Sequence, residues 1–549
     1  MNDERFEKAT DLIRMQVMWN RLIAIVEEQA QVLMRASFST STREAGDLSA
    51  GVFDATGRML AQSVTGTPGH VNSMAASVMH FLEAFPTDTM SPGDVYLTND
   101  PWKGTGHLYD FVVVTPVFHP NRPGSGVVAL FACTSHVVDI GGVGFGMEGR
   151  EVFHEGLYLP LLQLGRDGIL DPTILRIIRA NSRAPDMVDG DVHSLAACND
   201  RGATRLTEMM DEFQLDSLDA LADHVIDRSR AAMERLITDL PDGTWSNTMR
   251  IDGVDEPIDL VAALTIDGAR ITVDFSGTSP QSTWGINVPM AYTVAYTSFG
   301  IRCIIGPDVP NNAGSLGVIE VLAPPGSILN APFPAAVNVR HVVGQMLPDT
   351  VFGCLAQFLP ERVPAEGTSS LWNIVVDGHW ADGERYVVLS FHSGGAGARP
   401  SADGLSATAF PSGVRNMPVE INEAISPIVF WRKELRADSG GAGRYRGGHG
   451  QTIEIANREG RPFSISATYE RTKHPARGRH GGGPGATGSL GLASGPSIKA
   501  LGRSEIPGED RLILHVPGGG GFGDPGERDA GAIKAERQSG LVTGDQPAR

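Results

Sequence analysis

Residues 99–114 read NDPWKGTGHLYDFVVV, a glycine-rich turn that delivers His107 and Asp110 to the start of an apolar run. The β-branched residues of that run predict a buried strand. A second apolar segment, GVVALFACTSH, ends at His136 and is followed by Asp139 and two glycines. The two His-x-x-Asp motifs therefore place a histidine and a carboxylate at the ends of two strands that can pair.

Imidazole nitrogens and carboxylate oxygens that converge at strand ends are suitable ligands for a divalent ion such as Mn²⁺, Zn²⁺ or Fe²⁺. A single His-x-x-Asp motif is weak evidence, because strand-end histidines are often ordinary hydrogen-bonded residues. Two copies beside glycines bring the metal interpretation level with the ordinary one. Asp47 precedes another predicted strand and is either a third carboxylate of the site or a turn residue.

Composition narrows the class of protein. The chain has 549 residues and a net charge of −19, so we expect several domains and no nucleic-acid or anionic-membrane partner. Its four cysteines form no CxxC motif, which argues against a zinc ribbon or a disulfide framework. The charged N-terminus lacks a signal-type apolar core, and no apolar stretch is long enough to span a bilayer. We therefore expect a cytoplasmic protein.

The periodicity of the chain predicts an α+β protein of several lobes with mixed sheets, a helical middle region and a glycine-rich, β-dominated C-terminal part. Helical spacing occurs over 5–36 and 68–85, with a hairpin at 49–63 between them. The expected organisation is an N-terminal α+β lobe with the metal-site motifs at 1–165, a helical region at 166–240, a central α+β lobe at 241–370, the glycine-rich lobe at 371–528 and a flexible tail at 529–549.

Other candidates are weaker. Arg340 and His341 follow a proline-rich loop and either bind a phosphate or carboxylate or make structural contacts. Glu155 is a candidate general base, although most glutamates near glycine loops are merely solvated. The glycines of 392–400 can surround an anion, but simple turns are the better interpretation. The run PGGGGFGDP at 517–525 lacks the Gly-Lys-Ser/Thr ending of a phosphate loop, and that interpretation is rejected.

Longer motifs resemble those of the hydantoinase B/oxoprolinase family. They are REAGDLSAGVFDATGRMLAQS, PGHVNSM, GDVYLTNDPWKGTGHLYDFVVVTPVF, HVVDIGG and EVFHEGLYLPLLQL, followed by NVPMAYTVAY, PNNAGSL, APPGSILNAPFPAAV, RNMPVE, GAGRYRGG and PGGGGFGDP. The resemblance covers nearly the whole chain. The family includes subunits of ATP-dependent N-methylhydantoinase, 5-oxoprolinase, caprolactamase, and acetone and acetophenone carboxylases.

The resemblance implies a division of labour. A partner of A type, an ATPase, binds ATP and phosphorylates a carbonyl oxygen of a cyclic amide, and the present chain completes ring opening at a divalent metal. The family's ligands fall on Asp47, His107, Asp110 and His136, and Asp139 is then expected to orient His136. Many relatives have a second histidine where this chain has Val137, so a role for that histidine is in doubt here.

Three functions follow from these considerations. The leading one is the B-type component of an ATP-dependent hydrolase acting on cyclic amides, in a heterotetramer or a larger assembly. The second is a component of a biotin-independent ketone carboxylase, in which the partner activates a ketone or bicarbonate. The third is a non-catalytic scaffold for the ATPase, for which the retained histidines and carboxylates would have no use. No Walker motif is visible, so ATP hydrolysis is expected in the partner.

Overall fold

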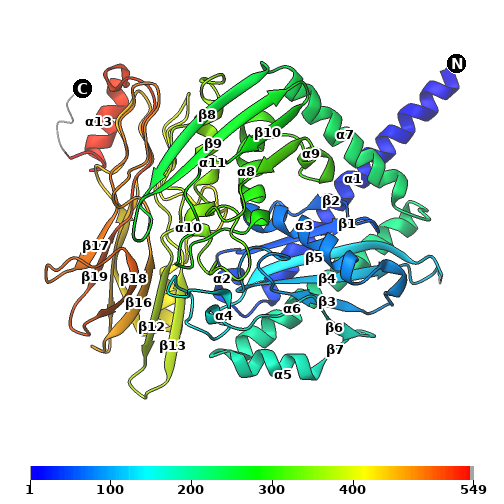
Figure 1. The fold of residues 1–549 in the computed structure, drawn as a ribbon, viewed down its shortest axis with the longest axis horizontal. Coiled ribbons are helices and arrows are strands. Elements are labelled where there is room, and N and C mark those ends of the chain that lie inside the picture. Colours follow the sequence, from blue (N-terminus) through cyan, green and yellow to red (C-terminus); the bar gives the residue numbers. More distant parts are fainter. Residues whose placement is uncertain (1, 123, 544–549) are drawn as a thin grey trace.

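The computed structural model describes residues 2–122 and 124–543. Four β-sheets and the helices packed against them make a mixed α+β fold, as the sequence predicted (Figure 1). The N-terminal sheet and its helices lie on one side of the molecule, and the C-terminal strands, yellow to red in Figure 1, lie on the other.

The N-terminal sheet has seven strands in the order β2-β1-β5-β4-β3-β6-β7, and each neighbouring pair is antiparallel. The two His-x-x-Asp motifs flank its central pair. The strands are β1 (Leu48–Phe53), β2 (Met59–Gln62), β3 (Val95–Thr98), β4 (Asp110–Phe118), β5 (Val127–His136), β6 (Leu162–Arg166) and β7 (Ile169–Leu170).

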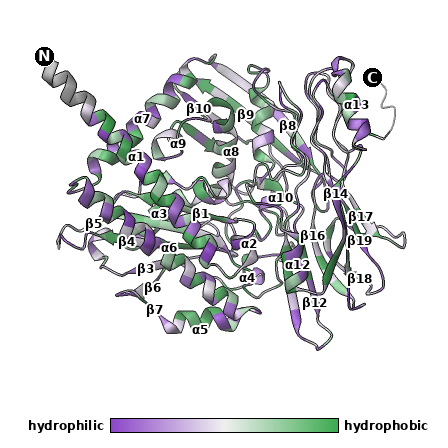
Figure 2. Ribbon diagram, turned by 180° about the vertical axis from the view of Figure 1, so that it is seen from behind, coloured by the Kyte–Doolittle hydropathy of each residue, from purple (hydrophilic) through white to green (hydrophobic). Residues whose placement is uncertain are grey.

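Helices cover both faces of this sheet, which explains why β4 and β5 are continuous apolar runs rather than alternating ones. On one face, α1 (Asn2–Ala36), α6 (Pro185–Glu212) and α7 (Asp219–Thr238) share a core with Phe131 of β5. On the other face, α3 (Pro68–Ala84) packs against Leu130. These helices show hydrophilic and hydrophobic residues along their length, as amphipathic helices do (Figure 2).

The central part of the chain forms a second sheet that packs against two buried helices. Its strand order is β11-β10-β9-β8. The elements are β8 (Gly243–Ile251), β9 (Ile258–Asp267), β10 (Arg270–Asp274), β11 (Ile319–Leu322), α8 (Met290–Ile305) and α11 (Leu347–Leu355), with the short helices α9 (Ala313–Leu316) and α10 (His341–Gly344). Helix α8 also packs on α3, which joins the central part to the N-terminal sheet.

Two four-stranded sheets follow and share one apolar core that includes Trp372, Ile453 and Ile465. The first has the order β13-β12-β16-β18 and the second β14-β15-β19-β17. Their strands are β12 (Ile374–His379), β13 (Arg385–Ser390), β14 (Ile428–Leu435), β15 (Gln451–Asn457), β16 (Phe463–Thr468), β17 (Ser489–Leu492), β18 (Leu501–Ile506) and β19 (Leu512–His515).

The glycine-rich segments beside these sheets lie against one another at backbone distance. A Cβ atom on Gly395 would lie 1.8 Å from the carbonyl oxygen of Gly448, and one on Gly447 would lie 1.9 Å from that of Gly519. Backbone hydrogen bonds join the segments, among them Gly519 N–H to Gly448 O at 2.9 Å. Only glycine allows such close approach.

The turn interpretation of residues 392–400 was therefore incomplete, and the anion interpretation finds no support. The amides of Gly395, Ala396 and Ala398 donate to the carbonyls of Pro517, Leu405 and Gly520, so they are already used in backbone pairing. The run at 517–525 is one of these packed glycine-rich segments, which together we call the glycine layer. Among the described residues, no long helix follows it as one follows a phosphate loop.

The remaining α-helices are α2 (Thr40–Arg43), α4 (Val152–Glu155), α5 (Pro172–Asn181), α12 (Val419–Ile425) and α13 (Ala530–Gln538). Of these, α2 is largely buried beside the end of β5. Helix α13 lies within the segment expected to be a flexible tail. Glu536 binds Arg446 and Arg528, which ties the helix to the glycine-rich lobe, while 544–549 lie outside the described residues. In the part of the chain that the structure describes, no helix has both the length and the apolar character needed to cross a bilayer.

Candidate metal centre

The antiparallel register of β4 and β5 creates the centre. Asp110, the first residue of β4, lies directly opposite His136, the last residue of β5. Directly opposed residues of an antiparallel pair have adjacent side chains, so the two motifs meet at one edge of the sheet. His107 comes from the turn before β4, where Gly106 has a φ of +100° that favours glycine.

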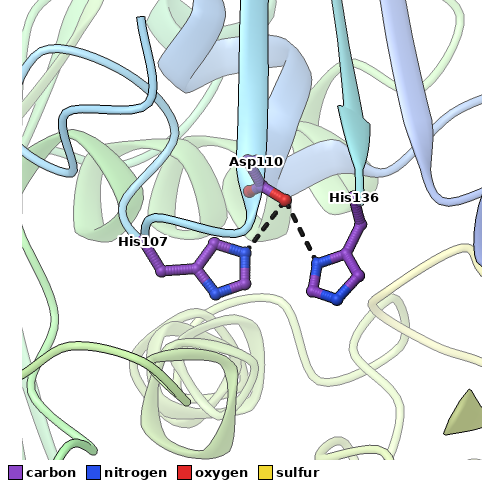
Figure 3. Close-up of side chains that lie close together, drawn as sticks. All are labelled: His107, Asp110 and His136. Atoms are coloured by element: carbon purple, nitrogen blue, oxygen red, sulfur yellow. Dashed lines mark hydrogen bonds and ion pairs between the residues drawn. The ribbon is translucent and has the colours of Figure 1, made fainter. Parts of the chain in front are cut away.

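The side chains of His107 and His136 converge on the carboxylate of Asp110 (Figure 3). His107 Nε2 lies 2.9 Å from Asp110 Oδ1, and His136 Nδ1 lies 3.4 Å from the same oxygen. One potential ligand atom from each residue falls within 4.8 Å of the others, and all three side chains are buried. The structure therefore brings together His107, Asp110 and His136 of the two motifs, while metal binding itself stays a prediction.

The second oxygen of Asp110 is held by three donors. Thr105 Oγ1 donates at 2.8 Å, Arg340 Nη2 at 2.5 Å, and His70 Nε2 lies at 3.0 Å. His70, in the first turn of α3, was not among the candidate residues. It belongs to the PGHVNSM motif, and a histidine at a helix start is too common to attract attention without the fold.

Asp47 lies on the opposite side of His70. Its Oδ1 accepts a hydrogen bond from Thr67 Oγ1 at 3.0 Å and lies 3.6 Å from His70 Nδ1. Asp47 lines the same small cavity as His70, His107 and His136, so the structure brings all four residues of the predicted ligand set to one place. Asp47 reaches the other three through His70 rather than by direct contact.

Burial and charge set the protonation states of the centre. Burial, assisted by the positive charge of Arg340, lowers the pKa of His107 to about 3, so its ring is neutral at pH 7. Burial alone would raise the pKa of Asp110, but the basic side chains around it hold it well below its usual range. A neutral imidazole beside an ionised carboxylate is the donor set that a divalent cation requires.

Unpartnered ring nitrogens support that interpretation. Within the described residues, His107 Nε2, His136 Nε2 and His70 Nδ1 are buried and have no hydrogen-bond partner of acceptable geometry. A buried polar atom without a partner is costly, and a bound cation would satisfy it. His107 Nδ1 is engaged at 2.8 Å by the carbonyl of Asn338, which leaves Nε2 as the nitrogen directed at the centre.

Arg340 and His341 lie in the cavity wall. The Arg340 guanidinium pairs with Asp110 and stacks over the ring of Tyr292 at 4.0 Å. Burial, with the charge of Arg340, holds the pKa of His341 well below its usual value, and its Nε2 lies 3.3 Å from Asn373 Nδ2. Both predicted binding residues therefore reach the centre, Arg340 at the carboxylate and His341 on the wall.

Glu155 occupies a supporting position rather than the cavity. Its Oε1 accepts hydrogen bonds from the backbone amides of Val337 at 2.7 Å and Asn338 at 2.8 Å, and burial raises its pKa to about 8. Because Asn338 accepts from His107, the carboxyl group holds the loop that orients His107. Glu155 is absent from the described residues that line the cavity, which does not support the general-base prediction.

Asp139 does not orient His136, contrary to expectation. Its Oδ1 binds Arg183 Nη1 at 2.6 Å, and its Oδ2 accepts from the amides of Arg183 at 2.5 Å and Gly141 at 3.2 Å. The ring of His136 has Nδ1 near Asp110 and, among the described residues, no partner at Nε2. The chain leaves the strand after His136, and this turns Asp139 toward the connection between α5 and α6.

The cavity itself is small, about 30 Å³. Besides the polar groups already described, apolar side chains close it: Phe145, Tyr292, Leu371, Phe391 and Val414. The space is sufficient for an ion or a water molecule, and any larger molecule would require a side chain of the wall to move.

Comparison with known proteins gives one family. The model described as hydantoinase B/oxoprolinase matches residues 11–525. The B component of a putative D-/L-hydantoinase from Pseudomonas sp. (strain NS671) is 28% identical over 98% of this chain and 94% of that protein. The beta component of the caprolactamase from Pseudomonas jessenii is 28% identical over 97% and 94%. The 5-oxoprolinase of Dictyostelium discoideum is 28% identical, and the match covers 40% of its length.

Solved structures agree. The ATP-dependent caprolactamase from Pseudomonas jessenii superimposes with a TM-score of 0.89 at 25% identity, over 97% of this chain and 94% of the matched chain. A nucleotide-free acetone carboxylase superimposes with a TM-score of 0.86 at 20% identity, over 97% and 78%. The second match establishes a shared fold alone.

Proposed function

This chain belongs to the hydantoinase B/oxoprolinase family, and from that membership we propose that it is the metal-containing component of an ATP-dependent cyclic amidase. One observation carries the proposal: His107, Asp110 and His136 present ligand atoms within 4.8 Å of one another, and Nε2 of His136 is buried without a partner among the described residues. Alignment with components of a hydantoinase and a caprolactamase over nearly their whole lengths favours the amidase.

The proposed reaction is shared between two subunits. An A-type partner transfers a phosphoryl group from ATP to the carbonyl oxygen of the ring amide, which removes amide resonance and activates the carbon. The intermediate then reaches the present chain, where water adds to that carbon and the ring C–N bond breaks as the nitrogen takes up a proton. Hydrolysis of the acyl phosphate that remains releases inorganic phosphate and leaves the carboxylate. Relatives that are named as single components of larger enzymes support the existence of a partner.

The residues of this chain hold and shield the reacting centre. His107, Asp110 and His136, with Asp47 behind them, would hold a divalent ion such as Mn²⁺ or Zn²⁺. Such an ion, when bound, lowers the pKa of water and polarises a carbonyl or phosphoryl oxygen. Arg340 brings a positive charge to the same wall, where a phosphorylated intermediate is stabilised. The apolar wall excludes bulk water, which would otherwise hydrolyse that intermediate wastefully.

Replacement of Asp110 with alanine tests the division of labour. In the complex with its partner, we expect substrate-dependent ATP hydrolysis to continue while ring opening falls to background, because the variant loses the carboxylate on which the centre is built. Asp267→Ala, at an exposed position at the end of β9, is the matched control and should retain both activities. Equal loss of ATP hydrolysis and ring opening in Asp110→Ala would contradict the proposal.

Isotope labelling separates the amidase from the ketone carboxylase, whose fold this chain shares. In ¹⁸O-water, an amidase incorporates solvent oxygen into the new carboxylate. A carboxylase instead transfers carbon from ¹³C-bicarbonate into its product. Incorporation of bicarbonate carbon, with no solvent oxygen in a new carboxylate, would replace the proposed function with the alternative. A non-catalytic scaffold predicts unchanged product formation in Asp110→Ala.

A further inference from the structure

The ring of Phe145 fills the space next to the candidate ligands. Its centroid lies 5.0 Å from that of His136 and 6.0 Å from that of His107, both in edge-on geometry. On its other side it is stacked on His341, with centroids 5.8 Å apart and planes inclined by 12°. A flat aromatic ring therefore already occupies a position between the three imidazoles.

The cavity beside that ring is too small for any cyclic amide. Its volume of about 30 Å³ is sufficient for a water molecule or an ion and is well below the roughly 300 Å³ or more of a typical ligand pocket. A five- or six-membered ring can come within reach of His107 and His136 only if a side chain of the wall moves away. The question is which side chain can move at the lowest cost.

Most of the wall is fixed by polar contacts. Arg340 is ion-paired with Asp110, His341 lies against Asn373, and Gln345 accepts from the backbone of Leu371. The other apolar side chains, Leu371, Phe391 and Val414, are only 2–4% exposed. Phe145 is 9% exposed and has no polar group to unpair.

The chain reaches the surface directly next to Phe145, although the ring itself is buried and also packs edge-on against Tyr109 with centroids 5.0 Å apart. The nearby Val143 is 46% exposed, and a Cβ on Gly144 would meet only one side-chain atom, Nη1 of Arg183 at 3.8 Å, among the described residues. Phe145 lies outside any helix or strand, so rotation of its side chain breaks no backbone hydrogen bond of an element.

The backbone on either side is held in place. Asn338 Nδ2 donates to the carbonyls of Gly144 at 2.8 Å and Gly146 at 2.7 Å, and the carbonyl of the same Asn338 binds His107. The main chain around Phe145 is thus tied to the candidate metal centre. The side chain can rotate while its Cα keeps its position relative to His107.

We propose that the side chain of Phe145 is a substrate gate: it rotates outward, and the ring of the cyclic amide takes its place, stacked on His341 and edge-on to His107 and His136. This inference rests on the proposed function for the class of substrate. Because the substrate occupies the space that the Phe145 ring leaves, a flat ring of five or six members should fit that space better than a bulky one.

Calorimetric titration of the full-length, metal-loaded chain with hydantoin tests the gate, because hydantoin has the flat five-membered ring of the activated intermediate without its phosphoryl group. Phe145→Ala removes the ring that must move, so we expect hydantoin to bind at least 10-fold more tightly than to the wild type. Phe145→Trp enlarges it and should weaken binding by at least 10-fold. Phe153→Ala removes a 60% exposed aromatic residue outside the cavity and should leave affinity unchanged. Phe145→Leu provides a second variant if the alanine variant does not fold.

Two results would overturn the inference: equal affinity of the wild type and the small variants for hydantoin, or no binding to any of them. A crystal structure of the wild-type complex in which Phe145 keeps its place and hydantoin binds elsewhere would do the same. Failure of the proposed function is separate, because it appears as absent metal in the wild type or as bicarbonate carbon in the product. The Phe145 variants retain every candidate ligand and should contain as much metal as the wild type.

Discussion

Asp110 organises the centre because both of its oxygens are engaged by basic or hydroxyl groups. One faces His107 and His136, and the other faces His70 and Arg340. Burying a carboxylate is unfavourable unless charge and hydrogen bonds compensate it, and here the compensation comes from four directions. The site is therefore a property of one residue and its neighbours, not of a flexible loop.

Loss of His107 should remove the metal. We expect His107→Ala to abolish stoichiometric metal content, because it deletes a neutral imidazole whose unpartnered Nε2 is directed at the centre. Elemental analysis of the purified chain measures this. His379→Ala, an exposed histidine of β12, is the matched control. Full metal content in His107→Ala would remove this residue from the ligand set.

Asp139 should matter for stability and not for metal. Asp139→Asn weakens a short charged contact with Arg183, which typically costs about 1.5–3 kcal/mol of unfolding free energy. Metal affinity should stay close to that of the wild type, since the carboxylate does not contact His136. Urea unfolding and metal titration of the same preparation measure the two effects. A large loss of affinity without loss of stability would restore the original expectation.

Glu155 should make the unfolding free energy depend on pH. Burial raises its pKa from an ordinary 4.5 to about 8, so the folded state favours the protonated form. The contribution of protonated Glu155 to the free energy of unfolding is fully present below pH 4.5 and is lost as pH rises toward 8. Glu155→Gln, which cannot ionise, should therefore become progressively more stable than the wild type as pH rises from 4.5 to about 8. Parallel pH profiles of urea unfolding for the two proteins would contradict this.

Among the elements, the strand pair β4–β5 and the glycine layer differ in how they depend on sequence. The strand pair needs apolar, β-branched residues and a register, and many sequences satisfy both. The glycine layer needs the absence of side chains at particular positions, because neighbouring carbonyl oxygens lie where Cβ atoms would be. Its tolerance to substitution should therefore vary sharply from one glycine to the next.

Two alanine substitutions test the layer. Gly447→Ala would place a Cβ 1.9 Å from the carbonyl oxygen of Gly519, so we expect a loss of about 3 kcal/mol or more, or no folded protein. Gly483→Ala is the matched control in the same layer, since its nearest neighbour would lie at an ordinary 3.6 Å. Thermal unfolding of both variants measures the difference in their melting temperatures. Similar melting temperatures would show that the layer relaxes around the added methyl group.

At the scale of the whole molecule, the centre is assembled from distant parts of the chain. Asp110 and Arg340 are separated by 230 residues, and Glu155 supports His107 through Asn338 across 183 residues. A reactive intermediate that passes from a partner must be enclosed while it moves. The proposed function therefore calls for a partner subunit whose surface completes the path to the cavity.

We accordingly expect a stable complex with an A-type ATPase, of heterotetramer size or larger. Co-expression followed by size-exclusion chromatography with light scattering measures the assembly, and ATP-dependent ring opening should co-elute with it. This chain eluting alone as a monomer, with full activity and no partner, would contradict the expectation. The separate lobes predicted for the chain remain a proposal that limited proteolysis can examine.

The sequence alone determined the α+β class, the central strands and the meeting of His107, Asp110 and His136. Apolar runs predict strands, and the pairing of two runs that carry equivalent motifs brings those motifs together. The family also followed from motifs spread along nearly the whole chain. These features depend on local patterns, which a linear sequence carries directly.

Only the tertiary structure decided the rest. His70 joins the centre because α3 begins beside β1, and Asp139 leaves it because the chain turns toward Arg183 after β5. The glycine runs pack on each other and use several of their amides in backbone pairing, and Phe145 lines the cavity. Each of these depends on contacts between segments far apart in the chain, and no periodicity or spacing within one segment specifies which distant backbone or side chain will lie against it.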